Sequence, residues 1–179
     1  MLQLVPIGSS ARTWVQHLAE PIRQQFGLEA QVGAPLADPA YAFNKDRKQY
    51  HSNAILRRLS ALRSREHFGV LGVADVDLFL PDHEFVFGEA DRESKVAMIS
   101  LTRLRPEYGG QAQDAELLKS RARVEAVHEV GHLLGLSHCD DGRCVMFFSA
   151  SVGDTDRKGL ALCHDCRAEL SRIAAMNNR

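Results

Sequence analysis

The stretch that decides the fold runs from His128 to His138 and reads His-Glu-Val-Gly-His-Leu-Leu-Gly-Leu-Ser-His. Residues four apart on a helix lie one above the other, so His128 and His132 can aim two imidazoles at one ion. Glu129 lies one step round the helix and would reach a metal-bound water rather than the metal. Gly135 tolerates the left-handed conformation that ends a helix, so the chain can turn back and deliver His138 as a third ligand. Three protein ligands plus water predict an open, catalytic zinc site.

Few random sequences would contain this pattern. The chain has 8 His and 13 Gly among its 179 residues. If these were placed at random, three His, one Glu and one Gly at these offsets would arise in roughly one of 10,000 such chains. We therefore favour a metal site over the alternative, a set of surface histidines that bind nothing.

Four cysteines follow the motif, and their spacing indicates a second metal. All of them lie within the last 41 residues: Cys139, Cys144, Cys163 and Cys166. Such intervals suit four thiolates around a closed, structural zinc, whereas two disulfides, unliganded thiols or a redox pair are the alternatives. Because Cys139 adjoins His138, this zinc would clamp the loop that carries the third ligand. His164 lies inside the last cysteine pair, and we expect it to be exposed rather than a ligand.

Outward from the motif, the apolar pattern predicts an α+β fold. A long helix from about Gln113 leads into the motif, and strands alternate with helices before it. This order predicts a mixed, twisted sheet of about five strands, with one antiparallel edge strand and helices packed on the sheet. The expected strands are Leu2 to Ile7, Leu28 to Val32, Val70 to Val73, Asp77 to Leu80, Phe85 to Gly88 and Lys95 to Leu101. Of these, Phe85 to Gly88 is short, aromatic and typical of an edge strand.

The two remaining helices and a long connection complete the expected order. Trp14 to Phe26 has an apolar face at helical spacing and ends at Gly27, but Pro21 implies a kink or a break. Ile55 to Leu62 gives another helix. Residues 33–50 contain two prolines and a polar run, which predicts a long exposed connection.

Composition bounds the class of protein. The formal net charge is −1, from 22 Lys and Arg against 23 Asp and Glu, and no stretch gathers the basic residues. Nucleic acid and anionic membranes are therefore poor partners, and we expect a monomer. The apolar start from Leu2 to Ile7 contains Pro6 and lacks the basic residues of a secretory signal, so we expect a cytoplasmic protein. The length suits a single domain over 1–179. We divide it into 1–134, ending in the motif helix, and 135–179, with the four cysteines and a C-terminal helix.

The histidine motif and the cysteines together resemble one family. The motif is similar to that of the metzincin clan of zinc peptidases, and Cys139, Cys144, Met146 and the final cysteine pair resemble archaemetzincins in particular. Shorter segments resemble that family too, among them residues 47–50, 85–90 and 100–104. The resemblance implies a zincin-like fold, in which Met146 would be the Met-turn residue that packs beneath the catalytic zinc without ligating it. The residues alone would assign Met146 to the core.

The resemblance also implies a function. His128, His132 and His138 would bind a catalytic zinc, Glu129 would be the general base, and the four cysteines would bind a structural zinc, giving two zinc ions per chain. We therefore expect a zinc-dependent metallopeptidase that acts on a peptide or protein held antiparallel to the edge strand. The rival hypothesis is a zinc-binding or peptide-binding module of the same fold with little turnover. Asp77 either orients a ligand imidazole or is held by backbone amides.

Overall fold

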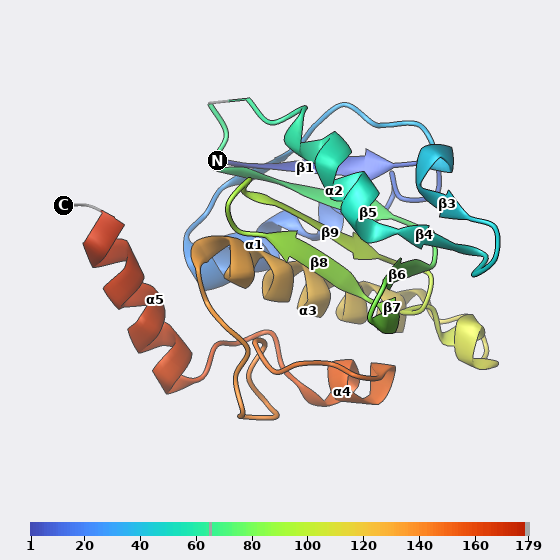
Figure 1. Ribbon diagram of the computed structural model, residues 1–179. Coiled ribbons are helices and arrows are strands. Elements are labelled where there is room, and N and C mark those ends of the chain that lie inside the picture. The colour runs from blue at the N-terminus through green and yellow to red at the C-terminus, as the bar shows by residue number, and fades with distance from the viewer. Residues whose placement is uncertain (65, 178–179) are drawn as a thin grey trace.

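The main sheet has five strands in the order β2-β1-β5-β9-β8 (Figure 1). The strands are β1 (Leu2–Ile7), β2 (Ala30–Val32), β5 (Gly69–Ala74), β8 (Gly88–Asp91) and β9 (Val96–Ser100). Four of them run parallel, and β8 pairs antiparallel with β9 at the edge. The computed structural model describes residues 1–64 and 66–177. The expected mixed sheet with one antiparallel edge strand is confirmed.

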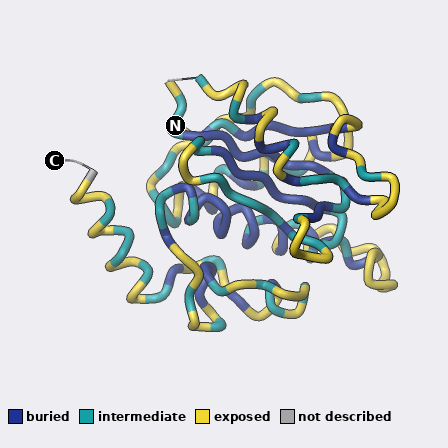
Figure 2. Tube along the Cα trace, viewed as in Figure 1, coloured by how far each residue is buried: buried dark blue, intermediate teal, exposed yellow. Residues whose placement is uncertain are grey.

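Helices cover both faces of this sheet because its central strands are apolar on both sides. The strand β5 is buried throughout, as is typical of a parallel strand between two helical layers. On one face, Leu4, Leu71 and Ile99 pack with α1 (Ala19–Phe26) and α3 (Ala115–Leu134). On the other face, their neighbours Val5, Val70 and Met98 pack against α2 (Ser52–Ser60). Figure 2 shows the buried chain concentrated in the sheet and in α3.

A second, smaller sheet corrects two expectations. It has the order β3-β4-β6-β7, formed by β3 (Phe43–Asn44), β4 (Gln49–His51), β6 (Leu78–Leu80) and β7 (His83–Val86). Residues 33–50 are therefore not a plain exposed connection, since they contain the short helix η2 (Ala40–Ala42) and the hairpin β3–β4. The edge strand of the main sheet is not Phe85 to Gly88 either. The first two of those residues belong to β7, which pairs with β6, and β8 begins at Gly88, because the chain passes between the sheets at Phe87.

The first and second helices also differ from expectation. The break falls before Pro21, between η1 (Val15–His17) and the start of α1 at Ala19. Pro21 is the third residue of α1, where a backbone N–H has no partner within the helix, so proline fits without a kink. The cap at Gly27 is confirmed by its φ of 64°. Helix α2 ends at Ser60 and leaves Leu62 40% exposed.

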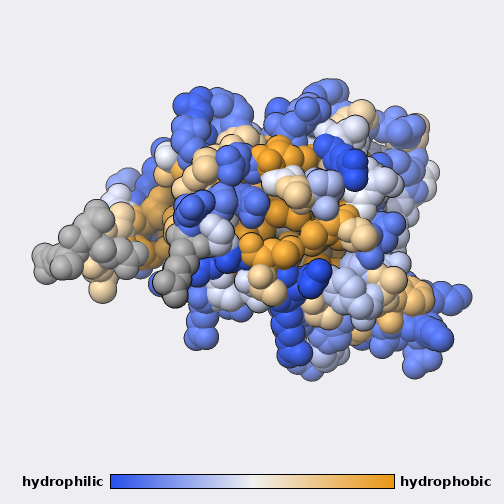
Figure 3. Space-filling model, turned by 90° about the horizontal axis from the view of Figure 1, so that it is seen from above, coloured by the Kyte–Doolittle hydropathy of each residue, from blue (hydrophilic) through white to orange (hydrophobic). Residues whose placement is uncertain are grey.

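Residues 139–177, the described part after the motif, contain no strand of either sheet. Helix α3 ends at Gly135, and the chain continues through α4 (Val152–Arg157) to α5 (His164–Asn177), with η3 (Pro106–Gly109) preceding α3. Figure 1 shows α4 below α3 and α5 extending away from the sheet. On the opposite side, that of α2, apolar side chains gather in the middle of the face within a hydrophilic surround (Figure 3). No helix among the described residues is long and apolar enough to cross a membrane.

Candidate metal centre

Helix α3 and the turn after it bring the three predicted histidines together. Their ligand atoms lie within 4.8 Å of one another, with His128 and His132 one helical turn apart and His138 opposite them. Gly135, at φ 108°, makes the turn that an L-residue with a side chain would strain. The three histidines and Gly135 therefore lie where the helical spacing predicts them.

Hydrogen bonds show which nitrogen of each ring is available. Nδ1 of His128 lies 2.7 Å from Val145 O, and Nδ1 of His132 lies 2.8 Å from Leu136 O. A carbonyl oxygen only accepts, so each Nδ1 donates and each neutral ring leaves Nε2 without a proton. The two Nε2 atoms lie 3.1 Å apart. Two lone pairs at that separation repel unless a cation lies between them, and tetrahedral Zn–N bonds of about 2.0 to 2.1 Å require a similar spacing.

Burial keeps these imidazoles in the neutral form that binds metal. Desolvation lowers the pKa of His128 well below its usual value, and the nearby charge of Lys158 acts in the same direction. Desolvation likewise lowers the pKa values of His132 and of the more exposed His138. A metal ion therefore meets little competition from protons near neutral pH.

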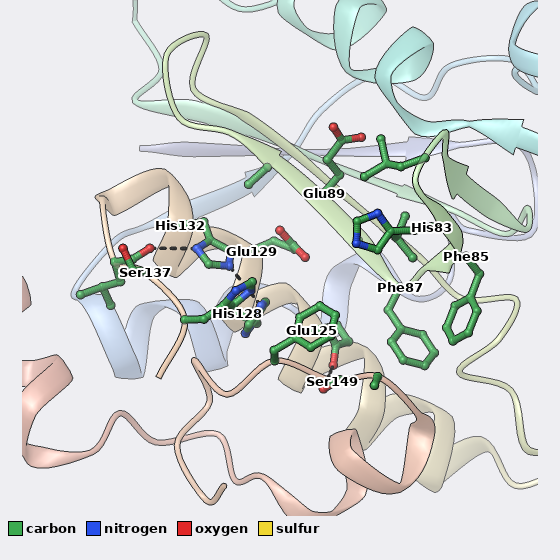
Figure 4. A pocket seen from close by; sticks show the side chains of 18 of the residues that line it. His83, Phe85, Phe87, Glu89, Glu125, His128, Glu129, His132, Ser137 and Ser149 are labelled. Carbon is green, nitrogen blue, oxygen red and sulfur yellow. Dashed lines mark hydrogen bonds between the residues drawn. The ribbon is translucent and has the colours of Figure 1, made fainter. Parts of the chain in front are cut away.

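Glu129 faces the same cleft from α3 (Figure 4). It is 5% exposed, and burial raises the pKa of its carboxyl well above the usual value, with Glu125 adding to the effect. Its carboxylate lies against the edge strand: a Cβ added at Gly88 would be 2.6 Å from Glu129 Oε1. A cation in the histidine site would favour the ionised carboxylate, opposing the effect of burial.

Met146 lies beneath the histidines, fully buried. A Cβ at Gly131, in the middle of the motif, would overlap the Met146 sulfur, so the missing side chain lets the two segments approach. The Cys139 N–H donates to Met146 O at 2.9 Å and ties this segment to the cysteine site. The expectation of a buried Met below the centre agrees with this packing.

The four cysteines form the second group. Their sulfurs lie within 4.8 Å of one another, and Sγ of Cys139 is 3.7 Å from Sγ of Cys163. Four Zn–S bonds of about 2.3 Å at tetrahedral angles give a similar sulfur spacing. The N–H groups of Asp141, Cys163 and Cys166 donate to cysteine sulfurs, and the last of these lowers the pKa of the Cys163 thiol. Such donors stabilise thiolates, the form that zinc requires.

A cleft of about 730 Å³ runs between the edge strand and the segment after Met146. Phe85, Phe87 and Phe148 line it together with the histidines and Glu129. In the pairing of β8 with β9, the Ser100 N–H donates to Phe87 O, and the register places Gly88 opposite Ile99. Hydrogen-bonded and non-bonded pairs alternate along an antiparallel ladder, so the backbone groups of Gly88 and Ala90 point away from β9.

Two other residues considered in the sequence lie apart from the histidines. The Asp77 carboxylate accepts hydrogen bonds from Arg103 at 2.6 and 2.9 Å and from Gln49 at 3.1 Å. It therefore neither orients a ligand imidazole nor relies on backbone amides. His164 is 96% exposed and pairs with Asp165, as expected of a histidine outside the metal site.

The sequence pattern did not identify four residues that shape the centre. Gly131 carries a signal, because glycine in a helix interior costs about 1 kcal/mol relative to alanine and points to a close approach. Gly88 is the first residue of the edge strand, and its neighbours carry no such signal. Lys158 and Glu125 form a buried ion pair beside His128. Neither residue belongs to a motif, so the sequence did not indicate that they would pair.

The chain is similar to known zinc peptidases in sequence and in structure. A family model described as peptidase family M54 matches residues 31–172. An archaemetzincin of Methanocaldococcus jannaschii is 40% identical over 92% of this chain and 89% of that protein. A zinc-dependent peptidase from Methanocorpusculum labreanum has a similar structure, with a TM-score of 0.87 and 27% identity over 95% of this chain and all of that one. An archaemetzincin structure from Methanopyrus kandleri gives a TM-score of 0.84 and 32% identity, over 98% of this chain and 96% of that one.

Proposed function

Because this chain belongs to peptidase family M54 and is a zinc-dependent metallopeptidase, we propose that His128, His132 and His138 hold its catalytic zinc and that Glu129 is its general base. The observation that carries this assignment is the pair of unprotonated Nε2 atoms 3.1 Å apart, with both Nδ1 atoms held by carbonyls. When bound, zinc lowers the pKa of its water toward about 7 and polarises the scissile carbonyl.

Glu129 moves the proton in this proposal. Its carboxylate accepts a proton from the attacking water and delivers it to the amide nitrogen of the leaving product. A carboxyl whose pKa is raised by burial is better matched to this exchange near neutral pH than an exposed one. The hydrogen bonds from the two imidazoles to Val145 O and Leu136 O fix the directions of the ligands.

The substrate is a peptide or protein in an extended conformation along β8. The outward backbone groups of Gly88 and Ala90 would pair with it, and Phe87 and Phe148 would contact its side chains. We expected Phe85 to Gly88 to be the edge strand that binds the peptide, and Gly88–Asp91 takes this place in the proposal. Phe85 and Phe87 line the wall of the cleft.

The four cysteines hold a structural zinc in this proposal, giving two zinc ions per chain. The Cys139 N–H bond to Met146 O, together with the neighbouring His138, makes this zinc a clamp on the loop of the third ligand. Met146 and Gly135 support the site without binding metal. We further propose that the protein is a monomer with one catalytic domain over 1–179. Its near-neutral charge argues against affinity for nucleic acid or membranes, and cysteines that bind zinc rather than form disulfides suit a cytoplasmic protein.

The test compares the parent with Glu129→Gln on a peptide library. Both proteins should bind two zinc ions, counted by elemental analysis, and only the parent should cleave. Cleavage by the variant at the parental rate would remove Glu129 from the mechanism. Peptide binding without cleavage by either protein would favour the rival hypothesis of a binding module.

A further inference from the structure

Lys158 is a buried cation beside the metal centre that the mechanism leaves without a role. It follows α4, and none of its side chain is exposed. Its Nζ lies 3.1 Å from Oε1 of Glu125, whose side chain is 3% exposed. Glu125 is on α3, one turn before Glu129, and Lys158 Nζ lies 3.4 Å from His128 Nδ1, so this ion pair adjoins the first histidine of the motif.

The Lys158 ammonium contacts the active-site helix and the Met146 segment at once. Besides Glu125, it donates to Phe147 O at 3.2 Å. It also lies 3.4 Å from Nδ1 of His128, whose own proton is directed to Val145 O. The short segment Val145–Phe147 therefore offers one carbonyl to the ligand histidine and another to Lys158, with Met146 between them.

Glu125 gathers further donors from the same region. Its Oε1 accepts from Thr155 Oγ1 at 2.9 Å and from Ser149 Oγ at 3.3 Å. Figure 4 shows Glu125 and Ser149 together at the base of the cleft. One carboxylate on α3 thus anchors Lys158, the helix α4 and the chain that follows Met146.

Stability does not account for this pair. Removing two charges from water costs more than their attraction commonly returns, and apolar residues of similar volume are often as stabilising or more so. An apolar pair, however, would have no donor for Phe147 O. Unlike an apolar residue, Lys158 donates a hydrogen bond to Phe147 O, and it thereby holds the segment whose Val145 O orients His128.

We propose that Lys158 is a positioning residue for the metal centre and that Glu125 is its anchor. Together they fix Val145–Phe147 against α3, so that Val145 O directs the His128 ring and Met146 stays beneath Gly131. This inference rests on the proposed function, because it takes the three histidines to be the zinc ligands.

The experiment uses Lys158→Met and the neutral double variant Glu125→Gln, Lys158→Met. The readouts are zinc affinity of the histidine site by chelator competition, free energy of unfolding, and the visible spectrum of Co²⁺ placed in that site with zinc retained by the cysteines. The exposed pair of Glu116 and Lys119 on the same helix provides a matched control, Glu116→Gln, Lys119→Met.

The single variant should lose stability, because it leaves Glu125 buried and unpaired, and its zinc affinity should fall. The double variant should recover the stability but still bind zinc about 10 to 100 times more weakly than the parent, as loss of groups that orient metal ligands typically does. Its Co²⁺ spectrum should differ from the parental one, and the control should match the parent in every readout.

Parental zinc affinity and a parental Co²⁺ spectrum in the double variant would overturn the inference and leave the proposed function intact. A parent that binds zinc only through its cysteines would overturn both. If the methionine variants do not fold, Glu125→Gln, Lys158→Leu replaces them, because leucine also has no donor for Phe147 O, with the same weakening expected and the same contrary outcome.

Discussion

At the scale of single residues, the centre depends on two glycines, which have no side chain, as well as on the histidines and Glu129. Gly88 makes room for the Glu129 carboxylate, and Gly131 makes room for the Met146 sulfur. Both glycines stand where two segments meet more closely than any Cβ would allow. The Glu129 carboxylate thus lies against the edge strand as well as on its own helix.

Gly88→Ala should therefore displace Glu129 without removing a zinc ligand. The new Cβ would lie 2.6 Å from Oε1 and 2.7 Å from Met98 O, so the carboxylate must move. A misplacement of about 1 Å can cost about 100-fold in rate, and we expect a loss of kcat of that order with zinc content unchanged. Gly142→Ala, whose Cβ would meet only Arg157 at 3.7 Å, is the control. A kcat for Gly88→Ala equal to that of the control would contradict the prediction.

Glu129 should also lower the stability of the metal-free protein. Burial raises the pKa of Glu129 in the folded state above the value of 4.5 in the unfolded state. Between these two pKa values the folded state holds a proton that the unfolded state has lost, so the free energy of unfolding falls as pH rises from 4.5 to the folded-state pKa. Metal-free Glu129→Gln should be more stable than the parent at pH 7, and the difference should vanish below pH 4.5. Urea unfolding of both proteins at several pH values measures this. Equal stability at pH 7 would show that the buried carboxylate carries no such cost.

At the scale of elements, the long periodic segments could be predicted from the sequence and the short ones could not. Helix α3 and the parallel strands follow from apolar runs and helical spacing, because their burial is extensive. The second sheet is held together by the pairing of β4 with β6, which lie far apart in the chain, and no local pattern encodes that pairing. The same limit applies at Phe87, where the passage from one sheet to the other shifted the edge strand by a few residues.

The open edge of β8 gives a prediction about substrate binding. The Ala90 N–H points away from β9, so Ala90→Pro should remove a hydrogen bond to the peptide while preserving the ladder. One such bond is worth about 0.5 to 1.5 kcal/mol, which corresponds to a rise in KM of about 2- to 12-fold. Zinc affinity should stay parental, and Ala90→Ser, which keeps the N–H, should behave like the parent. An unchanged KM in the proline variant would place the peptide elsewhere.

At the scale of the whole molecule, the two candidate metal sites are mechanically joined. The motif spacing was enough to predict which histidines and cysteines gather, because ligand geometry is local to a helix turn or a short loop. Their connection through the Met146 segment was not predictable, since it relies on backbone groups such as Cys139 N–H and Val145 O. Backbone hydrogen bonds of this kind leave no trace in residue identity.

Loss of the cysteine zinc should accordingly weaken the histidine site. Cys163→Ser should release one zinc per chain, make residues 135–177 sensitive to limited proteolysis, and lower zinc affinity at the histidines. His164→Ala, in the same cysteine pair but with its side chain exposed, should keep both metals. Parental zinc affinity at the histidines of Cys163→Ser would show that the two sites are independent.

The position of the clamp along the chain has a consequence for biosynthesis. A ribosome releases the strands of the main sheet first, then the three histidines, and only later the segment with Cys163 and Cys166. The loop that carries His138 is therefore left without its clamp while translation proceeds. If the four cysteines hold a zinc as proposed, a nascent chain would bind zinc at its histidines more weakly than the finished chain does, until its later cysteines have emerged.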